Sequence, residues 1–261
     1  MTALAALLFC EKLFLWFVFY SFCGWVYETV LISVQQRHFV NRGFLNGPYC
    51  PIYGAGAIAI YLLLWDVSNP FALFVAGGVV ACILEYVTSY VLEKAFGARW
   101  WDYSQRPFNL NGRTCLGAAV VFGAFSLVFV KVVHPPVMAV TDMIPMTVLH
   151  ILAIAFVVIL GADTTVTIAG LVGFSERVQA AVDAVTVAVE KLKTQTSERA
   201  ADATAHNAEV LRSASAIRDA VVQRLTVQQR RMLHAFPQLN LPDRSDLIPR
   251  LRELIDKRHR R

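Results

Sequence analysis

The sequence predicts an all-α membrane protein: a polytopic helix bundle of about five transmembrane helices, followed by a long cytoplasmic C-terminal helix. Hydrophobic residues make up 56% of the 261 positions and charged residues only 16%, whereas roughly a quarter of the residues of a soluble domain are charged. The mean hydropathy is +0.51. Apolar runs of near-membrane length fill residues 1–172. We therefore divide the chain into a transmembrane bundle, residues 1–172, and a cytoplasmic helical tail with coiled-coil tendency, residues 173–261.

Five apolar runs approach the roughly 20 helical residues that cross a bilayer. They cover residues 13–34, 52–65, 71–92, 116–133 and 148–171. The second run is short unless its helix begins near Tyr49. Prolines at this point are compatible with a helix start, because the first turn of a helix needs no amide donor.

The connections between the runs predict the orientation, since cytoplasmic loops carry an excess of Lys and Arg. Arg37 and Arg42 follow the first run and four basic residues follow the third, whereas residues 66–70 and 133–147 contain none. We predict a multi-pass protein of the plasma membrane with its N-terminus outside and its C-terminus in the cytoplasm. The lipid bilayer is its first partner.

The tail carries all of the net charge of +5, with sixteen Lys or Arg against eleven Asp or Glu, while residues 1–172 contain eight of each. From Val178 to Leu192 apolar residues recur at alternating spacings of four and three, after a candidate N-cap at Ser175. We expect a helix over residues 176–235. It would associate with itself or with a partner helix, or lie as an amphipathic helix on the bilayer surface.

Two stretches match each other 65 positions apart. Residues 45–50 and 110–115 share Leu-Asn-Gly followed three positions later by Cys, and the same offset superposes Glu28 on Glu93. Each copy has an acid in or near the end of an apolar run, a basic turn and a further apolar run. This pattern is typical of a parallel duplication of a two-helix unit, with chance similarity as an equal alternative.

Carboxylates within the apolar runs are the first candidates for function, because a charge at a helix centre costs roughly 2.5–3.5 kcal/mol on the insertion scale. Glu28, Glu85 and Glu93 lie on helical faces with small polar residues. The alternatives are a structural ion pair or hydrogen bond for Glu28 and Glu85, and pairing with a neighbouring basic residue for Glu93. Asp163 ranks lower, because the threonines around it favour local hydrogen bonding.

The loops that enter the second and fourth runs complete the candidate site. Asn46 and Asn111 each belong to an Asn-Gly turn before a predicted helix, with Arg42 and Arg113 nearby. Backbone amides at a helix N-terminus attract anions. We therefore expect a phosphate, carboxylate or lipid head group to bind here, unless the arginines only mark the cytoplasmic leaflet.

Asp102 lies among the aromatic residues 100–104 and is placed to hold Arg106 or Arg113. With Asn109 from the same loop, the set of candidate binding residues is Glu28, Arg42, Asn46, Glu85, Glu93, Asp102, Asn109, Asn111 and Arg113.

No metal, cofactor or nucleic-acid site is expected. The five cysteines lack CxxC spacing, and the histidines are isolated in the sequence. No GxxxxGK[ST] motif occurs, so this chain does not itself hydrolyse ATP by a P-loop. No catalytic residues are assigned, and an enzyme is the less expected class.

Several ordered motifs resemble the CmpB-like family: residues 20–25 with Glu28, residues 41–54, residues 84–86 and residues 100–113. The similarity covers roughly residues 13–135. It implies a multi-pass membrane protein of a family catalogued as type IV ABC-transporter permeases, with no established substrate. A separate ATPase partner is implied only if that description is right. The chain shows no evident coupling-helix signature of the usual importers, and the tail lies outside the match.

Three functions follow as hypotheses. The leading one is a transporter or permease component with a polar site at the cytoplasmic side, where Glu28 and Glu93, related by a pseudo-twofold axis, line a cleft with Glu85. The second is an intramembrane enzyme acting on a lipid-linked or anionic amphiphilic substrate, with a Glu or Asp102 as acid or base. The third is a membrane scaffold that assembles partners through its coiled-coil tail.

Overall fold

A computed structural model describes residues 2–180, 183–184, 187, 225–236 and 238–241. It contains two compact units, the first made of Met1–Val91 and Trp101–Ala169 and the second of Leu92–Trp100 and Gly170–Arg261. The described residues include four helices that are long and apolar enough to cross a membrane. The prediction of a helical, multi-pass membrane protein is thus confirmed.

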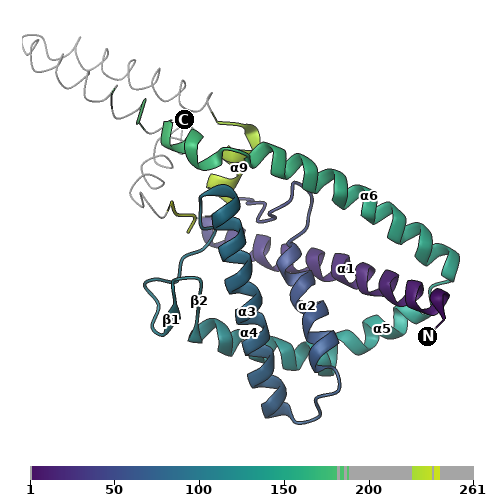
Figure 1. The fold of residues 1–261 in the computed structure, drawn as a ribbon. Helices are drawn as coiled ribbons and strands as arrows, with labels where there is room; N and C mark the ends of the chain where they lie inside the picture. The colour runs from purple at the N-terminus through teal and green to yellow at the C-terminus, as the bar shows by residue number, and fades with distance from the viewer. Residues whose placement is uncertain (1, 181–182, 185–186, 188–224, 237, 242–261) are drawn as a thin grey trace, which may run out of the picture. The chain divides into compact units, whose positions relative to one another are not determined.

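Helix α1, Ala3–Gln36, begins about ten residues earlier than the apolar run predicted (Figure 1). The Thr2 side chain caps it by accepting a hydrogen bond from the Ala5 amide at 3.3 Å. Its 34 residues correspond to about 51 Å, so the helix is longer than the hydrocarbon layer of about 30 Å. Arg37 ends it in the left-handed conformation.

Helix α2, Pro51–Leu64, has only 14 residues and a length of about 21 Å. It is therefore not among the four long helices. It packs closely on α1, because Gly54 lies against the Phe17 carbonyl and the Ser21 hydroxyl, and Gly24 lies against the Tyr53 ring. A side chain at either glycine would overlap these atoms.

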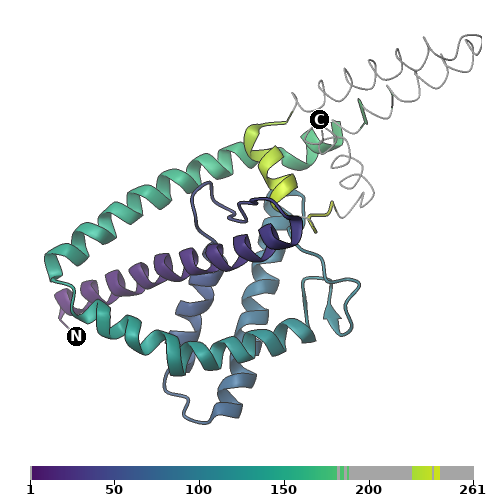
Figure 2. The same cartoon turned by 180° about the vertical axis from the view of Figure 1, so that it is seen from behind.

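Helix α3, Pro70–Phe96, is followed by a loop with a two-stranded hairpin, β1 (Asn109–Leu110) and β2 (Thr114–Cys115). Helix α4, Leu116–Val128, is followed without a break by the π-helix η1, Phe129–Val133, and by α5, His134–Asp142. The three form one continuous helical segment (Figures 1 and 2). Gly78 on α3 lies against the Ala119 carbonyl of α4. Two helix pairs, α1 with α2 and α3 with α4, thus pack through glycines.

The fourth span does not end at residue 133, where the sequence predicted a loop. Pro135 and Pro136, which lack an amide donor, follow the π-helix at the start of α5. The π-helix directly before them is a local adjustment of the kind that accommodates irregular helix geometry.

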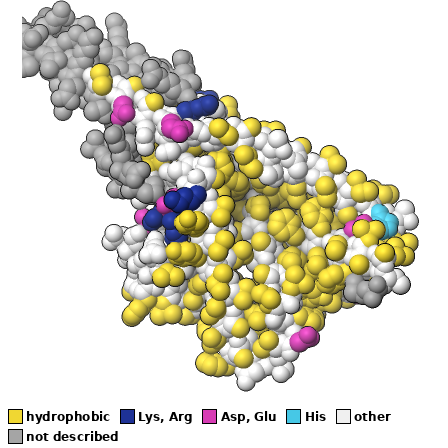
Figure 3. All heavy atoms as spheres, in the orientation of Figure 1, with side chains coloured by type: hydrophobic (Ala, Val, Ile, Leu, Met, Phe, Trp, Pro, Cys, Tyr) yellow, Lys and Arg dark blue, Asp and Glu magenta, His cyan; other side chains and the backbone are white. Residues whose placement is uncertain are grey.

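Helix α6, Met146–Leu171, completes the first unit apart from its last two residues, which belong to the second. Large apolar side chains on the long helices are widely exposed, for example Val30 at 57% and Ile154 at 65%. Figure 3 shows hydrophobic side chains over most of the visible helical surface, with few charged groups. Such a surface suits acyl chains.

The second unit has its own core, in which Trp100, Phe174, Met232 and Leu233 are almost wholly buried. Helix α9, Val227–Ala235, starts at Thr226 with a capping box.

The helix predicted over residues 176–235 is wrong in one respect, since it does not run unbroken to Ala235. Thr226 begins a separate helix, and its hydroxyl donates to the Gly170 carbonyl at 3.2 Å. Residues 188–224, where most of the predicted coil falls, lie outside the described residues.

Candidate functional site

Glu28, Arg42 and Tyr53 form a first cluster, which we term the Glu28 half-site. Arg42 Nη2 lies 3.1 Å from Glu28 Oε2, and its Nε donates to the same oxygen at 3.2 Å. The Tyr53 hydroxyl of α2 donates to Glu28 Oε1 at 2.7 Å. Both carboxylate oxygens have partners, so the ion pair that the sequence left as an alternative role for Glu28 is present.

The loop that delivers Arg42 is held by side chains of α1. The Asn41 side-chain oxygen accepts from Trp25 Nε1 at 2.7 Å and from the Gly43 amide at 3.0 Å. The Arg42 amide donates to the Thr29 hydroxyl at 3.4 Å. These contacts orient the guanidinium toward Glu28 before any ligand is present.

Asp163 of α6 binds the first Asn-Gly turn. Its carboxylate accepts from the Gly47 amide at 2.7 Å, the Asn46 amide at 2.9 Å and the Asn46 side chain at 3.0 Å. Thr167, one turn further along α6, donates to it at 3.1 Å. The backbone amides that the sequence assigned to an external anion therefore contact the chain's own carboxylate. Asp163 is the residue whose importance the sequence reasoning underrated.

Glu85, Tyr103 and Thr114 form a second cluster, the Glu85 half-site. Glu85 on α3 is only 6% exposed, and the Tyr103 hydroxyl donates to its Oε1 at 2.9 Å. Within the described part of the chain its Oε2 has no hydrogen-bond partner, and neither has the hydroxyl of Thr114, which lies beside the carboxylate.

Tyr103 lies close to both acids. Burial raises the pKa of its phenol above the ordinary value of 10.0, and the negative charges of Glu85 and, more weakly, Glu28 raise it further. The phenol therefore stays protonated, and a donor, at neutral pH. The sequence grouped Glu28 with Glu85, and the structure brings both within electrostatic range of one tyrosine that the sequence reasoning had not selected.

Arg113 does not reproduce the role of Arg42. It is buried, with Nη1 donating to the Ser89 hydroxyl at 3.3 Å. Its guanidinium carbon lies 5.7 Å and 5.3 Å from the ring centroids of Tyr86 and Tyr90, within the range of cation–π contact. Over the described residues, Glu85 forms no ion pair.

The second Asn-Gly turn forms the tip of the hairpin. Asn111 and Gly112 have φ values of 53° and 69°, and the Arg113 amide donates to the Leu110 carbonyl at 3.0 Å, which is the pattern of a type I′ turn. The Asn109 side chain accepts from the Gly112 amide at 2.9 Å. Asn111 itself donates to the Tyr86 hydroxyl at 3.0 Å.

The two remaining candidate acids have local partners. Asp102 accepts from the Ser104 amide at 2.9 Å and from the Ser104 hydroxyl at 2.5 Å, which closes a turn. Glu93 pairs with Arg99 at 2.5 Å in the second unit, as the interfacial alternative predicted. We therefore build the site from the Glu28 and Glu85 half-sites, without Glu93.

Two histidines that are isolated in the sequence have partners in the fold. His134 is fully buried, with Nδ1 at 2.9 Å from the Tyr20 hydroxyl, and its ring stacks on Phe129 at 4.9 Å. His150 Nδ1 lies 2.7 Å from the carboxylate of Glu11. Neither contact involves the two half-sites.

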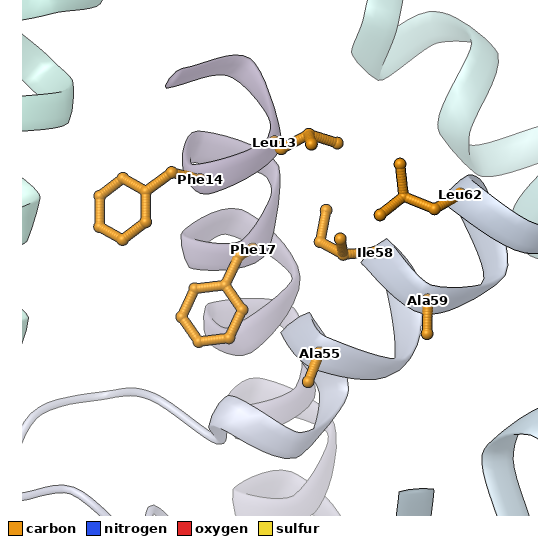
Figure 4. A pocket seen from close by; sticks show the side chains of 7 residues that line it. All are labelled: Leu13, Phe14, Phe17, Ala55, Ile58, Ala59 and Leu62. Carbon is orange, nitrogen blue, oxygen red and sulfur yellow. The ribbon is translucent and has the colours of Figure 1, made fainter. Parts of the chain in front are cut away.

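A pocket of about 460 Å³ lies between α1 and α2 (Figure 4). It falls in the size range of small-molecule sites, but its lining is wholly apolar and consists of Leu13, Phe14, Phe17, Ala55, Ile58, Ala59 and Leu62. It therefore supplies no group that recognises a polar ligand, and the groups that bear chemistry lie outside it.

Comparison with known proteins gives one match. A family model named ABC_trans_CmpB and described as "Putative ABC-transporter type IV" matches residues 15–168, a range that includes both half-sites and Asp163. No curated protein and no solved structure matches the chain significantly.

Proposed function

We propose that this chain, which belongs to the ABC_trans_CmpB family, is a permease-like component that passes a polar solute between its α1–α2 and α3–α4 helix pairs. The observation that carries the proposal is that Glu28 and Glu85, two acids on membrane-spanning helices, each accept a hydrogen bond from a tyrosine hydroxyl, that of Tyr53 and that of Tyr103. Ionisable residues inside membrane bundles commonly line substrate or ion pathways. The transporter class is thus favoured over an enzyme.

The proposed topology has five crossings, four by the long helices and one by α2. The short α2 can cross if the bilayer thins or if its flanking residues reach the interface. Because cytoplasmic loops carry an excess of Lys and Arg, the basic loops around Arg42 and Arg113 favour a cytoplasmic position of the half-sites and an N-terminus outside in this proposal. The membrane is then the plasma membrane.

A parallel duplication of a two-helix unit would relate the α1–α2 pair to the α3–α4 pair by a pseudo-twofold axis. Helix α2 begins directly after Cys50 and α4 directly after Cys115, so both begin at the same point of the 65-residue offset. The pairs Tyr53–Glu28 and Tyr103–Glu85 are alike in chemistry but do not follow this offset, which relates Glu28 to Glu93. Permeases of this kind bind solute at the interface of their repeats.

An anionic ligand or lipid head group at the first loop would have to take the place of a carboxylate of this chain. Arg42 is engaged by Glu28, and the amides of Asn46 and Gly47 by Asp163. In this proposal the ligand exchanges with Glu28 on Arg42, which would couple binding to a movement of α1. A separate ATPase would power the cycle if the family description holds.

Complementation tests the proposal. A strain that lacks the chain and shows a growth or uptake defect is supplied with Glu28→Gln, Glu85→Gln or Arg113→Ala variants, each checked for membrane expression. We expect the two Gln variants to lose most of the activity, at least tenfold. The matched control is Glu93→Gln, which alters an acid of the same helix as Glu85 but outside the half-sites, and should keep it. Full complementation by well-expressed Glu28→Gln and Glu85→Gln would refute the proposal.

A further inference from the structure

Glu85 differs from Glu28 in having no cation to balance a negative charge. Its side chain is more than nine-tenths buried, one carboxylate oxygen accepts only from Tyr103, and the other has no partner in the described structure. A lone buried carboxylate is strongly disfavoured in a low-dielectric interior, and such groups commonly become neutral by binding a proton.

Among the residues that the structure describes, no Lys, Arg or His forms an ion pair with Glu85. Cys82 on α3 and Cys115 at the start of α4 are free cysteines. Tyr103 is a neutral donor whose charge environment also includes the carboxylate of Glu28. Arg113 contacts the Ser89 hydroxyl and two tyrosine rings.

Thr114 is the candidate hydrogen-bond partner of a proton on Glu85 Oε2. Its hydroxyl is 95% buried, lies beside Glu85 and has no hydrogen-bond partner in the described structure, as is true of Glu85 Oε2. A proton on Oε2 makes that oxygen a donor, and the Thr114 oxygen can accept it after a small rotation. The hydroxyl's own proton can make the same link to a carboxylate, but only an added proton also removes the buried charge of Glu85.

We propose that Glu85 is a proton-binding site, with Tyr103 donating to Oε1 and Thr114 accepting from the protonated Oε2. The step moves one proton from water to Glu85 Oε2, so that the carboxylate becomes a neutral carboxylic acid; release is the reverse and leaves the carboxylate. The site stands on burial and geometry. Its use to drive solute movement, in contrast, rests on the proposed function.

Infrared spectroscopy of the full chain in lipid nanodiscs at neutral pH tests the site directly, because a protonated carboxyl has a carbonyl stretch separate from that of a carboxylate. We expect this band in the wild type and in Glu28→Gln, and its loss in Glu85→Gln. Absence of the band from the wild type, or its persistence in a folded Glu85→Gln variant, would overturn the proposal.

Thr114→Val provides a second test if Glu85→Gln does not fold. Loss of the accepting hydroxyl should shift the carbonyl band to higher frequency, and an unshifted band would contradict the assigned partner. Replacing K⁺ by Na⁺ at fixed pH should leave the band unchanged; its disappearance would identify a metal cation as the ligand and overturn the proton assignment. The spectra need no transport activity, so they separate failure of the proton site from failure of the permease proposal.

Discussion

The loops at residues 37–50 and 97–115 carry the same Leu-Asn-Gly sequence, yet they are held in different ways. The first loop is fixed by distant helices, through Asp163 of α6 and Glu28 of α1. The second loop closes on itself as a hairpin, with two left-handed residues and the Asn109 side chain in the turn, and further side-chain hydrogen bonds go to the neighbouring helix α3. The Leu-Asn-Gly motif thus predicts a turn, but the geometry of that turn depends on the contacts that its residues make with the rest of the chain.

The largest loss of stability is expected when the first loop loses its partner Asp163 on α6. Asp163→Ala removes charge-assisted hydrogen bonds to two amides and two side chains. Since each such bond contributes about 1.5–3 kcal/mol, we expect the free energy of unfolding to fall by about 3 kcal/mol after partial relaxation. Denaturation in mild detergent measures it.

Asp102→Ala is the control for this first change, because the carboxylate of Asp102 closes a local turn through Ser104. Asp102→Ala should lower the free energy of unfolding by about 1 kcal/mol. Equal costs for the two Asp variants would show that the two loops depend on distant partners to the same degree.

The next effect concerns the ion pair of the Glu28 half-site. Arg42→Ala leaves Glu28 without its cation and should destabilise the protein by about 2 kcal/mol, below the range for fully buried pairs because both side chains are partly exposed. In the Glu28→Gln background the same change should cost much less. A double-mutant cycle measures the coupling, and additive costs would exclude a stabilising pair.

A smaller loss of stability is expected from the backbone conformation of the second turn. Gly112 has a φ of 69°, so Gly112→Ala forces a side chain into the left-handed region and should cost about 1 kcal/mol. Gly117→Ala is the matched control, since only Cys115 Sγ lies near a new Cβ, at 3.9 Å. It should be neutral or slightly stabilising in the thermal unfolding of the same preparations. A neutral Gly112→Ala would argue against the hairpin turn.

The smallest effect is the pH dependence of the stability that Tyr103 contributes in the Glu85 half-site. The raised pKa of Tyr103 means that the unfolded chain loses this phenol's proton first as the pH rises. Its contribution to stability is therefore complete below about pH 10 and is lost above it. Ultraviolet titration just above pH 10 should show fewer phenolates in wild type than in an unfolded sample, and Tyr103→Phe should reduce that deficit by one.

The class of fold could be predicted because composition and run length alone distinguish membrane helices. Glu28 and Glu85 could be selected as well, since an acid in an apolar run is conspicuous. Asp163 was underrated because its partner Asn46 is 117 positions away, and no local pattern reveals such a contact. The extension of the fourth span through Pro135 was missed because proline usually ends a helix, and no local sequence pattern reveals the π-helix that precedes it.

The hydrogen bond between Thr226 and Gly170 joins two points of the chain that are 56 positions apart in the sequence. Residues 188–224, which lie between these two points in the sequence, are outside the described residues. The chain can therefore be cut down there by protein engineering. Replacing residues 188–224 with a short linker, or with a fluorescent reporter, keeps the Gly170–Thr226 junction and the membrane helices in one polypeptide.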